Sequence, residues 1–332
     1  MRIIHVRDVA NVAQFLVRGL SELGHEVDFV SPSESAEQRV WRKTLVAPRR
    51  LMDGLRINTL IHQQKFDIVH FHYANSGWMG RLGRYSYFLH CHGSDVRLDL
   101  YDPVRKWPVL HSLAGACGVF ISTPDLYQHV ASLRPDAAFL PNPIDTRIFT
   151  PLSNGNHTNI RILINQALKA SKAPDVAFGA AQRLRRAHKN IEIYAIAQGP
   201  ELERFRDCDE VRFIEPVPHS RMPEVINSFD IILGQFEIGS LGVSELESMA
   251  CSKPVVSCVD MVMYNQWYGE PPPILSACET DAVVEAVVSL IQQRDLREEL
   301  GSQARAWVLK HHDYLAVATK LAARYRTFLG RE

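Results

Sequence analysis

The sequence predicts an α/β protein built from two doubly wound domains, and three observations point to this class. Short apolar runs typical of strands alternate with amphipathic runs typical of helices along the whole chain. The 332 residues are about twice the length of an ordinary domain. A polar stretch at residues 153–159 interrupts the alternation and is typical of a linker.

The predicted elements follow in order on either side of that linker. Before it, strands are expected at 2–6, 26–30, 67–71, 87–91, 118–122 and 138–140, with a helix at 12–23 that ends at Gly24. After it, strands are expected at 161–164, 192–197, 211–214, 231–233 and 254–258, and helices at 176–187, 223–228, 244–250, 281–294 and 295–309. In such folds a ligand binds at the carboxyl ends of the strands, in the cleft between the domains.

The composition excludes several classes of function. Apolar residues make up 46% of the chain, and the 37 basic residues balance the 37 acidic ones, so no overall field attracts nucleic acid or a membrane. No signal peptide and no apolar run of about 18 residues is apparent. The six cysteines form no CxxC pair, and we expect reduced thiols rather than disulfides or a zinc site. A cytoplasmic protein is therefore expected.

The most informative stretch runs from Gly239 to residue 256. Gly242 opens a helical run that carries Glu245 and Glu247. Free N–H groups at a helix start bind phosphate, and an acid further along the helix can accept hydrogen bonds from ribose hydroxyls. The pattern indicates a nucleoside diphosphate ligand, and the alternative is a surface helix with a solvated acidic face.

The run Leu-Glu-Ser-Met-Ala at 246–250, followed by Pro-Val-Val at 254–256, resembles the signature of retaining glycosyltransferase family 4. Weaker similarities to the family occur in the family's order at 23–27, 66–72, 90–95 and 140–149. The resemblance covers nearly the whole chain and implies a GT-B fold, in which two Rossmann-like domains face a central cleft. It implies an acceptor-side domain over 1–153, a nucleotide-sugar domain over 154–313, and a last helix over 314–332 that packs back on the first domain.

The resemblance implies transfer of a sugar from a UDP- or GDP-sugar donor to a glycan, a polysaccharide or a lipid-linked acceptor, with retention. No Asp-x-Asp metal pair stands in a suitable place, so we expect no metal and no cofactor. Cationic side chains and a helix start would then stabilise the leaving diphosphate. Two alternatives remain open: a nucleotide-sugar 2-epimerase of the same fold, and a catalytically weak partner subunit that binds nucleotide or glycan.

The family pattern also implies donor-binding residues in the second domain. Lys169 and Lys172 stand where the family has an Arg and a Lys that hold the diphosphate, and Lys at the first position offers no bidentate fork. Glu247 stands where the family bonds the donor ribose. Gly239 replaces the family's first motif Glu, and Glu237 is a possible substitute. The remaining expected donor contacts are Gly199, Val217, Gly242, Val243 and Ser244.

In the first domain, His92 and Asp95 lie in a His-Gly-x-Asp turn and are the expected catalytic residues beside the reacting carbon. An imidazole there could hydrogen-bond a sugar hydroxyl or share developing charge. Asp8 and Asn11 follow the first strand and are expected on the acceptor side, although the family's Gly-Gly turn is absent there. Three further histidines are expected to be structural: His70, His72 and His90.

Residues 39–52, from Arg39 to Met52, combine five basic residues with apolar ones. Such a segment can lie on an anionic membrane surface, which would place the protein at the inner face of the cytoplasmic membrane. The alternative is an ordinary amphipathic helix and loop facing solvent.

Overall fold

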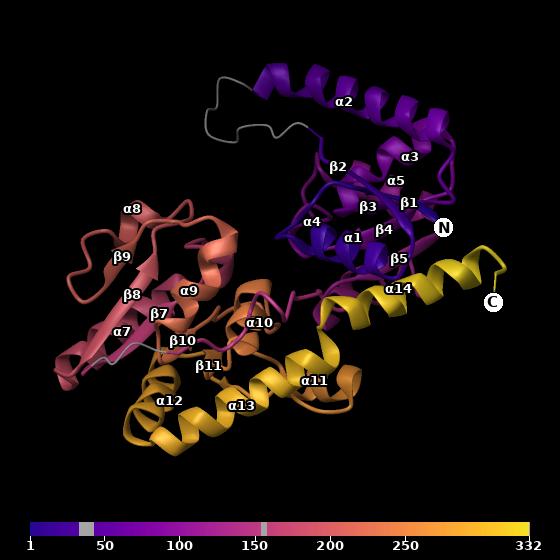
Figure 1. Cartoon of the computed structure of the whole chain (residues 1–332). Helices are drawn as coiled ribbons and strands as arrows, with labels where there is room; N and C mark the ends of the chain where they lie inside the picture. Colours follow the sequence, from indigo (N-terminus) through magenta and orange to yellow (C-terminus); the bar gives the residue numbers. More distant parts are fainter. Residues whose placement is uncertain (33–42, 154–157, 332) are drawn as a thin grey trace. The chain divides into compact units, whose positions relative to one another are not determined.

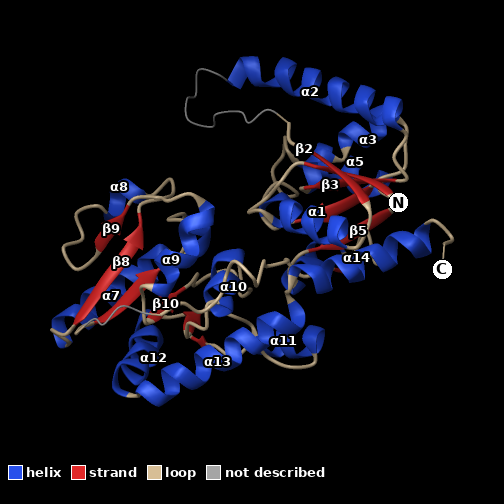
Figure 2. Ribbon diagram, in the orientation of Figure 1, coloured by secondary structure: helices blue, strands red, loops and turns tan. Residues whose placement is uncertain are grey.

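The computed structural model describes residues 1–32, 43–153 and 158–331 (Figure 1). The chain divides into two compact units, which are described separately below. Unit 1 comprises Met1–Pro143 and Tyr314–Glu332, and unit 2 comprises Ile144–Asp313. Each unit contains one six-stranded parallel sheet with helices around it, which confirms the predicted two-domain α/β class (Figure 2).

The sheet of unit 1 has the strand order β2-β1-β3-β4-β5-β6. Its strands are β1 (Arg2–Val6), β2 (Glu26–Val30), β3 (Ile68–His72), β4 (Phe88–Cys91), β5 (Gly118–Ile121) and β6 (Ala138–Phe139). Its longer helices are α1 (Val12–Glu22), α2 (Lys43–Gln64), α5 (Lys106–Gly115) and α14 (Tyr314–Phe328). Every residue of β3 is buried, as expected for a central strand covered on both faces.

The last helix, α14, packs along the first helix, α1, although the two are far apart in sequence (Figure 1). A Cβ on Gly19 would lie 2.6 Å from Cβ of Ala318 and 2.9 Å from the carbonyl oxygen of Tyr314, so the small residue permits the close approach. The Tyr314 hydroxyl also donates to Glu22 at 2.8 Å. The chain terminus thus completes unit 1.

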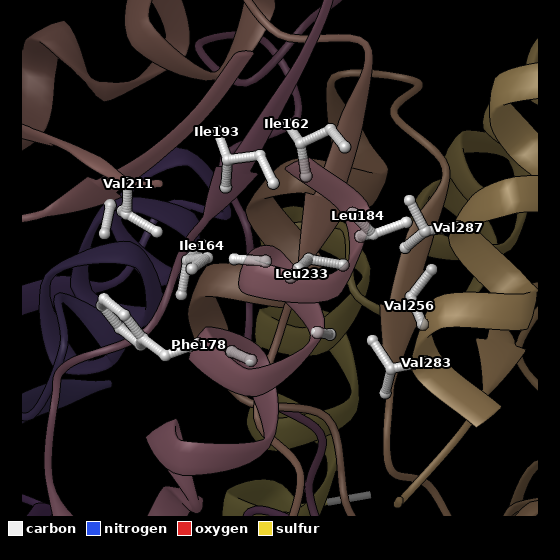
Figure 3. Close-up of a cluster of buried hydrophobic side chains, with 14 of the residues drawn as sticks. Ile162, Ile164, Phe178, Leu184, Ile193, Val211, Leu233, Val256, Val283 and Val287 are labelled. Atoms are coloured by element: carbon white, nitrogen blue, oxygen red, sulfur yellow. The ribbon is translucent and has the colours of Figure 1, made fainter. Parts of the chain in front are cut away.

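The sheet of unit 2 has the order β12-β11-β10-β7-β8-β9. Its strands are β7 (Ile160–Ile164), β8 (Ile191–Ile196), β9 (Arg212–Ile214), β10 (Ile231–Leu233), β11 (Val255–Ser257) and β12 (Leu275–Ser276). Its longer helices are α7 (Pro174–Ala187), α10 (Val243–Ala250), α11 (Met261–Tyr268), α12 (Thr280–Gln292) and α13 (Arg294–His311). Figure 3 shows its core, in which sheet residues such as Ile162, Ile193 and Leu233 meet Phe178 of α7 and Val287 of α12.

The units divide after Pro143, whereas the sequence placed the boundary after residue 153. The side chain of Asn227 explains the difference, because it bonds this connecting segment to unit 2. Its Oδ1 accepts the N–H of Leu152 at 3.0 Å, and its Nδ2 donates to the carbonyl of Thr150 at 2.9 Å. Of the expected linker at 153–159, residues 154–157 lie outside the described residues.

The expectation that all cysteines are reduced is wrong, because Cys258 and Cys278 form a disulfide. Cys258 directly follows β11, and Cys278 stands two residues after the short strand β12. The two strands pair in parallel and bring together residues that are 20 apart in sequence. The sequence did not predict β12, so nothing in it indicated this proximity. The other four cysteines are free: Cys91, Cys117, Cys208 and Cys251.

The predicted strands and helices match observed elements with small differences at their ends. Of the longer helices, α5 and α11 were not predicted, and the beginning of α2 was considered only as the alternative for residues 39–52. The basic segment at 39–52 lies partly outside the described residues, and its remainder begins α2. Leu51 and Met52 on this helix are exposed by 50% and 69%. Across the described parts of the chain, no helix combines the length and the apolar character needed to span a membrane.

Candidate functional site

The predicted donor-site residues gather at the carboxyl-end edge of the sheet in unit 2. The loop after β7 carries Lys169 and Lys172, and the loop after the neighbouring strand β10 leads into α10. The two loops are bonded to each other, because the N–H of Phe236 donates to the carbonyl of Lys172 at 3.0 Å. Asn165, at the end of β7, also donates to Ser248 of α10 at 3.1 Å. The lysine loop and α10 therefore form one connected surface.

Gly199 packs against the backbone of the loop that carries the two lysines. Its φ is +130°, and a Cβ there would lie 2.3 Å from the carbonyl oxygen of Leu168. Leu168 donates its N–H to Gln198 at 2.7 Å and accepts that of Glu201 at 3.0 Å. Only glycine fits this position, and the contact fixes the residue that precedes Lys169. Gly199 thus shapes the loop that presents the lysines.

The start of α10 has no side-chain cap. Gly242 is its N-cap residue, and among the residues that the structure describes no side chain accepts a hydrogen bond from the first N–H groups, including those of Val243 and Ser244. Both residues are partly exposed. A Cβ on Gly242 would lie 2.8 Å from Oε2 of Glu245, so a larger residue there would require this carboxylate to move. The positive end of the helix dipole therefore faces the same edge as the two lysines.

Glu245 has a structural role. It is fully buried, and its Oε1 accepts the N–H of Gln235 at 2.9 Å. Gln235 in turn organises the loop around Gly239: its Oε1 accepts the N–H groups of Glu237 and Ile238 at 2.8 and 2.6 Å. Glu237 itself is exposed, and Gly239 adopts a left-handed conformation with φ +74°.

Glu247 is buried rather than displayed on a solvated helix face, with 5% of its surface exposed. Its Oε1 lies 2.6 Å from Nε2 of His219, which packs on Phe149 with ring centroids 5.2 Å apart. Burial raises the pKa of Glu247, and the hydrogen bond from His219 opposes that rise. No motif in the sequence indicated His219. Val217, two residues earlier, is partly exposed, as a ligand contact requires.

In unit 1, Asp8 holds the beginning of α1. Its Oδ1 accepts the N–H groups of Val9 and Ala13, each at 2.9 Å. The turn around it contains Arg7, Ala10 and Asn11 with φ values of 71°, 51° and 62°. All three lie in the left-handed region that the family's glycines would adopt without strain. The left-handed turn after β1 therefore forms here without glycine.

Arg7 connects the ends of three strands and was not recognised from the sequence. Its Nη1 donates to Oδ1 of Asn75 at 2.9 Å, and its guanidinium lies over the ring of Tyr73 at 4.4 Å. The Tyr73 hydroxyl in turn bonds Oγ of Ser94 at 2.9 Å. These contacts join the carboxyl ends of β1, β3 and β4 into one surface.

Asp95 is fully buried, and its carboxylate is occupied by backbone donors. It accepts N–H groups at 2.7 to 3.1 Å from four residues: Ala74, His92, Gly93 and Val96. Burial raises the pKa of Asp95, and these four hydrogen bonds oppose the rise. The two residues of the expected catalytic pair therefore differ in their surroundings. Asp95 holds the turn, whereas His92 is partly exposed.

His92 belongs to a row of histidines on one face of the sheet. Nε2 of His92 lies 2.9 Å from Nδ1 of His72, and Nε2 of His72 lies 2.8 Å from Nδ1 of His5. Ligand atoms of two triplets, His5/His70/His72 and His72/His90/His92, lie within 4.8 Å of one another. Two nitrogens on one tetrahedral zinc ion are about 3.3 Å apart, given Zn–N bonds of about 2.0–2.1 Å. The distances of 2.8 and 2.9 Å between the rings are shorter than this spacing, so we interpret them as hydrogen bonds rather than as the spacing of two zinc ligands.

Comparison with protein families finds a match in each half of the chain. Residues 9–148 match the family described as Glycosyltransferase Family 4, and residues 177–323 match a family described as Glycosyl transferase-like. This chain is a family 4 glycosyltransferase. The first match lies mainly in unit 1 and the second mainly in unit 2. The resemblance first seen in short motifs therefore extends over both halves of the enzyme.

Two curated relatives of the glycosyltransferase share less than a third of their aligned residues with it. A phosphatidylinositol N-acetylglucosaminyltransferase component from Arabidopsis thaliana is 28% identical over 136 residues, which cover 38% of this chain and 30% of that protein. The match thus spans less than a third of that relative's length. D-inositol 3-phosphate glycosyltransferase from Kribbella flavida is 22% identical over 314 residues, covering 82% of this chain and 74% of the relative.

Solved structures show that the enzyme has the GT-B fold. Sucrose-phosphate synthase from Thermosynechococcus elongatus superposes with a TM-score of 0.78 at 15% identity and covers both chains fully, at 100% each. HepE from Anabaena, solved with UDP-glucose, superposes with a TM-score of 0.76 at 12% identity, covering 98% of this chain and 100% of that one. These identities support the fold alone.

Proposed function

We propose that this glycosyltransferase transfers a sugar from a nucleoside-diphosphate sugar, with UDP as the first nucleotide to test, to a hydroxyl group of an acceptor. The observation that carries the proposal is the edge of unit 2, where Lys169, Lys172 and the uncapped start of α10 surround one surface. Such a surface suits a diphosphate. HepE was solved with UDP-glucose, which supports UDP as the nucleotide.

In this proposal the protein stabilises the leaving group without a metal ion. As the bond between the sugar carbon and the phosphate oxygen breaks, negative charge grows on the diphosphate. The two lysines and the N–H groups of Val243 and Ser244 stabilise that charge. Glu247 accepts hydrogen bonds from the ribose, and Val217 lies beside the base. Gly239 lies where the family contacts the donor sugar through a glutamate, so sugar recognition differs here.

We propose that the reaction retains the anomeric configuration. The acceptor oxygen attacks the sugar carbon from the face that the leaving group vacates, and the diphosphate takes the acceptor proton. No protein base or nucleophile is then required. His92 hydrogen-bonds the sugar, and Asp8 and Asn11 lie on the acceptor side of unit 1.

The acceptor is proposed to be a glycan, a polysaccharide or a lipid-linked sugar, as in polysaccharide biosynthesis. A lipid-linked acceptor would require contact with a membrane surface, and the exposed Leu51 and Met52 on α2 support this part of the proposal. Sedimentation with vesicles of anionic and of neutral lipid tests it. Binding to the anionic vesicles alone is expected, and binding to neither would contradict a peripheral contact.

The proposed activity is tested by incubating the enzyme with UDP- and GDP-sugars and a panel of sugar acceptors in EDTA. Release of the nucleoside diphosphate that depends on the acceptor, with an unchanged anomeric configuration in the product, is expected. Conversion of the donor to an epimer without that release would indicate a 2-epimerase instead. Nucleotide binding without any turnover would indicate a protein that only binds its ligands. The Lys172→Ala variant should release the nucleoside diphosphate more slowly than the wild type.

A further inference from the structure

Three imidazoles in unit 1 form one hydrogen-bonded chain. His5 comes from β1, His72 from β3, and His92 follows β4. The links are 2.8 Å from Nδ1 of His5 to Nε2 of His72 and 2.9 Å from Nδ1 of His72 to Nε2 of His92. His5 and His72 are fully buried, whereas His92 is partly exposed. The chain therefore runs from the interior of the sheet face to its carboxyl-end edge.

Each link needs one proton, and each neutral imidazole supplies one N–H group and one lone pair. Burial lowers the pKa of all three rings, to about 3 for His5, so all three are neutral at pH 7. The protons must then all point the same way. If His5 donates from Nδ1, His72 accepts at Nε2 and donates from Nδ1, and His92 accepts at Nε2 and carries its proton on Nδ1.

The buried end of the chain sets this direction. Nε2 of His5 is buried and has no hydrogen-bond partner among the residues that the structure describes. The reverse direction would leave an N–H group at that atom with no acceptor. Buried N–H groups without a partner are rarer in proteins than buried acceptors without one. The proton of His5 is therefore assigned to Nδ1. The two hydrogen bonds then place the proton of His92 on its Nδ1 as well.

We propose that His5 and His72 are positioning residues that fix His92 as its Nδ1–H tautomer, so that His92 offers a hydrogen-bond donor to an oxygen of the bound ligand. No bond to Nδ1 of His92 is found within the described parts of the chain, and the ring is partly exposed. The ligand chemistry is a hydroxyl or phosphate oxygen, and its identity as the donor sugar rests on the proposed function. The assignment of the tautomer does not.

Nuclear magnetic resonance of the full chain with ¹⁵N-labelled histidine tests the assignment directly. Protonated and unprotonated ring nitrogens have well-separated resonances, and single histidine variants assign them. The expected spectrum has the proton on Nδ1 of His5, His72 and His92. A proton on Nε2 of any of the three would overturn the proposal. So would a change of these resonances on adding EDTA, because it would indicate a bound metal ion.

Two variants on the same sheet face separate positioning from general packing. In His5→Gln the side-chain amide can either donate to Nε2 of His72 or accept a hydrogen bond from it, so both proton directions are satisfied. His92 should then become a mixture of tautomers, and kcat/KM should fall about twofold or more. His70→Gln is the matched control. His70 is equally buried and stacks on His5 with ring centroids 4.8 Å apart. Its Nδ1 bonds the hydroxyl of Tyr325, so His70 takes no part in the hydrogen bonds that link His5, His72 and His92.

His70→Gln should leave the tautomer of His92 and kcat/KM unchanged. A single Nδ1–H tautomer of His92 in the His5→Gln variant would contradict the proposal. An equal change in the tautomer of His92 and in kcat/KM for the His5 and His70 variants would also contradict the proposal. Because the tautomer is measured on the free protein, failure of this inference is distinguishable from failure of the proposed transferase activity.

Discussion

The carboxylate of Glu247 lies 2.6 Å from Nε2 of His219 while only 5% of the glutamate surface is exposed. The residue proposed to hold the donor ribose is therefore already oriented by a partner from the loop after β9. His219 also packs against Phe149, which is fully buried. The pair connects the proposed ribose contact to the core of unit 2.

Replacing Glu247 by Gln should weaken UDP binding by roughly 10- to 100-fold, because a charge-assisted hydrogen bond to the ribose becomes a neutral one. Titration calorimetry measures this directly. Glu224→Gln is the matched control, since the Glu224 side chain is 62% exposed on the neighbouring helix α9 (Met222–Asn227). Equal affinities of the Glu247→Gln variant and the wild type would contradict the ribose contact.

The same carboxyl predicts a pH dependence. Burial raises the pKa of Glu247, so the folded protein holds this proton more tightly than the unfolded chain does. This group therefore stabilises the fold as the pH falls through its raised pKa and loses that contribution as the pH rises. UDP binding, which is proposed to use the carboxylate, should change in the opposite sense.

The affinity of the wild type for UDP should thus decline on acidification at a pH above the range of an exposed glutamate. The Glu247→Gln variant controls for the titration of UDP itself. Parallel pH profiles for the two proteins would remove Glu247 as the cause.

Lys172→Ala should lower UDP affinity about tenfold or more and leave the melting temperature nearly unchanged, because the side chain is partly exposed and is proposed to contact only the diphosphate. The loss should shrink as salt is added. Lys189→Ala, at an exposed position in unit 2, is the charge-matched control and should bind UDP normally. Equal binding by both variants would reject the diphosphate site.

Gly199 and Gly239 offer a paired test of backbone strain. Both adopt positive φ values, +130° and +74°, but only Gly199 faces backbone atoms where a Cβ would lie. Gly239→Ala should reduce the free energy of unfolding by about 1–2 kcal/mol, from the left-handed conformation alone. Gly199→Ala should reduce it by clearly more, because Leu168 must also move. Denaturant unfolding compares the two, and an equal loss would contradict the supporting contact.

The sequence predicted the two sheets well because parallel strands buried on both faces appear as short β-branched runs, as in β3 and β7. It also predicted the uncapped start of α10, since Gly242 and the following residues are contiguous. Contacts between distant segments could not be predicted in this way. His219 reaches Glu247, and Asn227 holds residues 150–152, only because the fold brings separate loops together.

Roles within a motif were equally hidden. His92 and Asp95 stand in one turn, and a sequence pattern does not distinguish the residue that faces a ligand from the one that holds the turn. Burial and the four backbone donors to Asp95 make that distinction. Glu245 and Glu247 are both nearly inaccessible, and only the partner of each separates the structural acid from the proposed ligand contact.

The disulfide between Cys258 and Cys278 should stabilise unit 2 by roughly 3 kcal/mol, given the 20-residue separation of the two cysteines. A reducing agent should therefore lower the melting temperature of the wild type. A variant with both residues changed to Ser should melt lower and show no response to the reductant. An identical melting temperature for the oxidised and reduced wild type would contradict a stabilising bond.

The central claim is that the edge of unit 2 formed by Lys169, Lys172 and the start of α10 binds a nucleoside diphosphate without a metal ion. Thermal unfolding in EDTA with UDP, GDP, ADP, dTDP or uridine tests it most directly. A nucleoside diphosphate at about 100 times its Kd should stabilise the protein by roughly 2.7 kcal/mol and raise Tm by several degrees, whereas uridine should not. No shift with any nucleotide, or a shift that appears only when magnesium is added, would contradict the account.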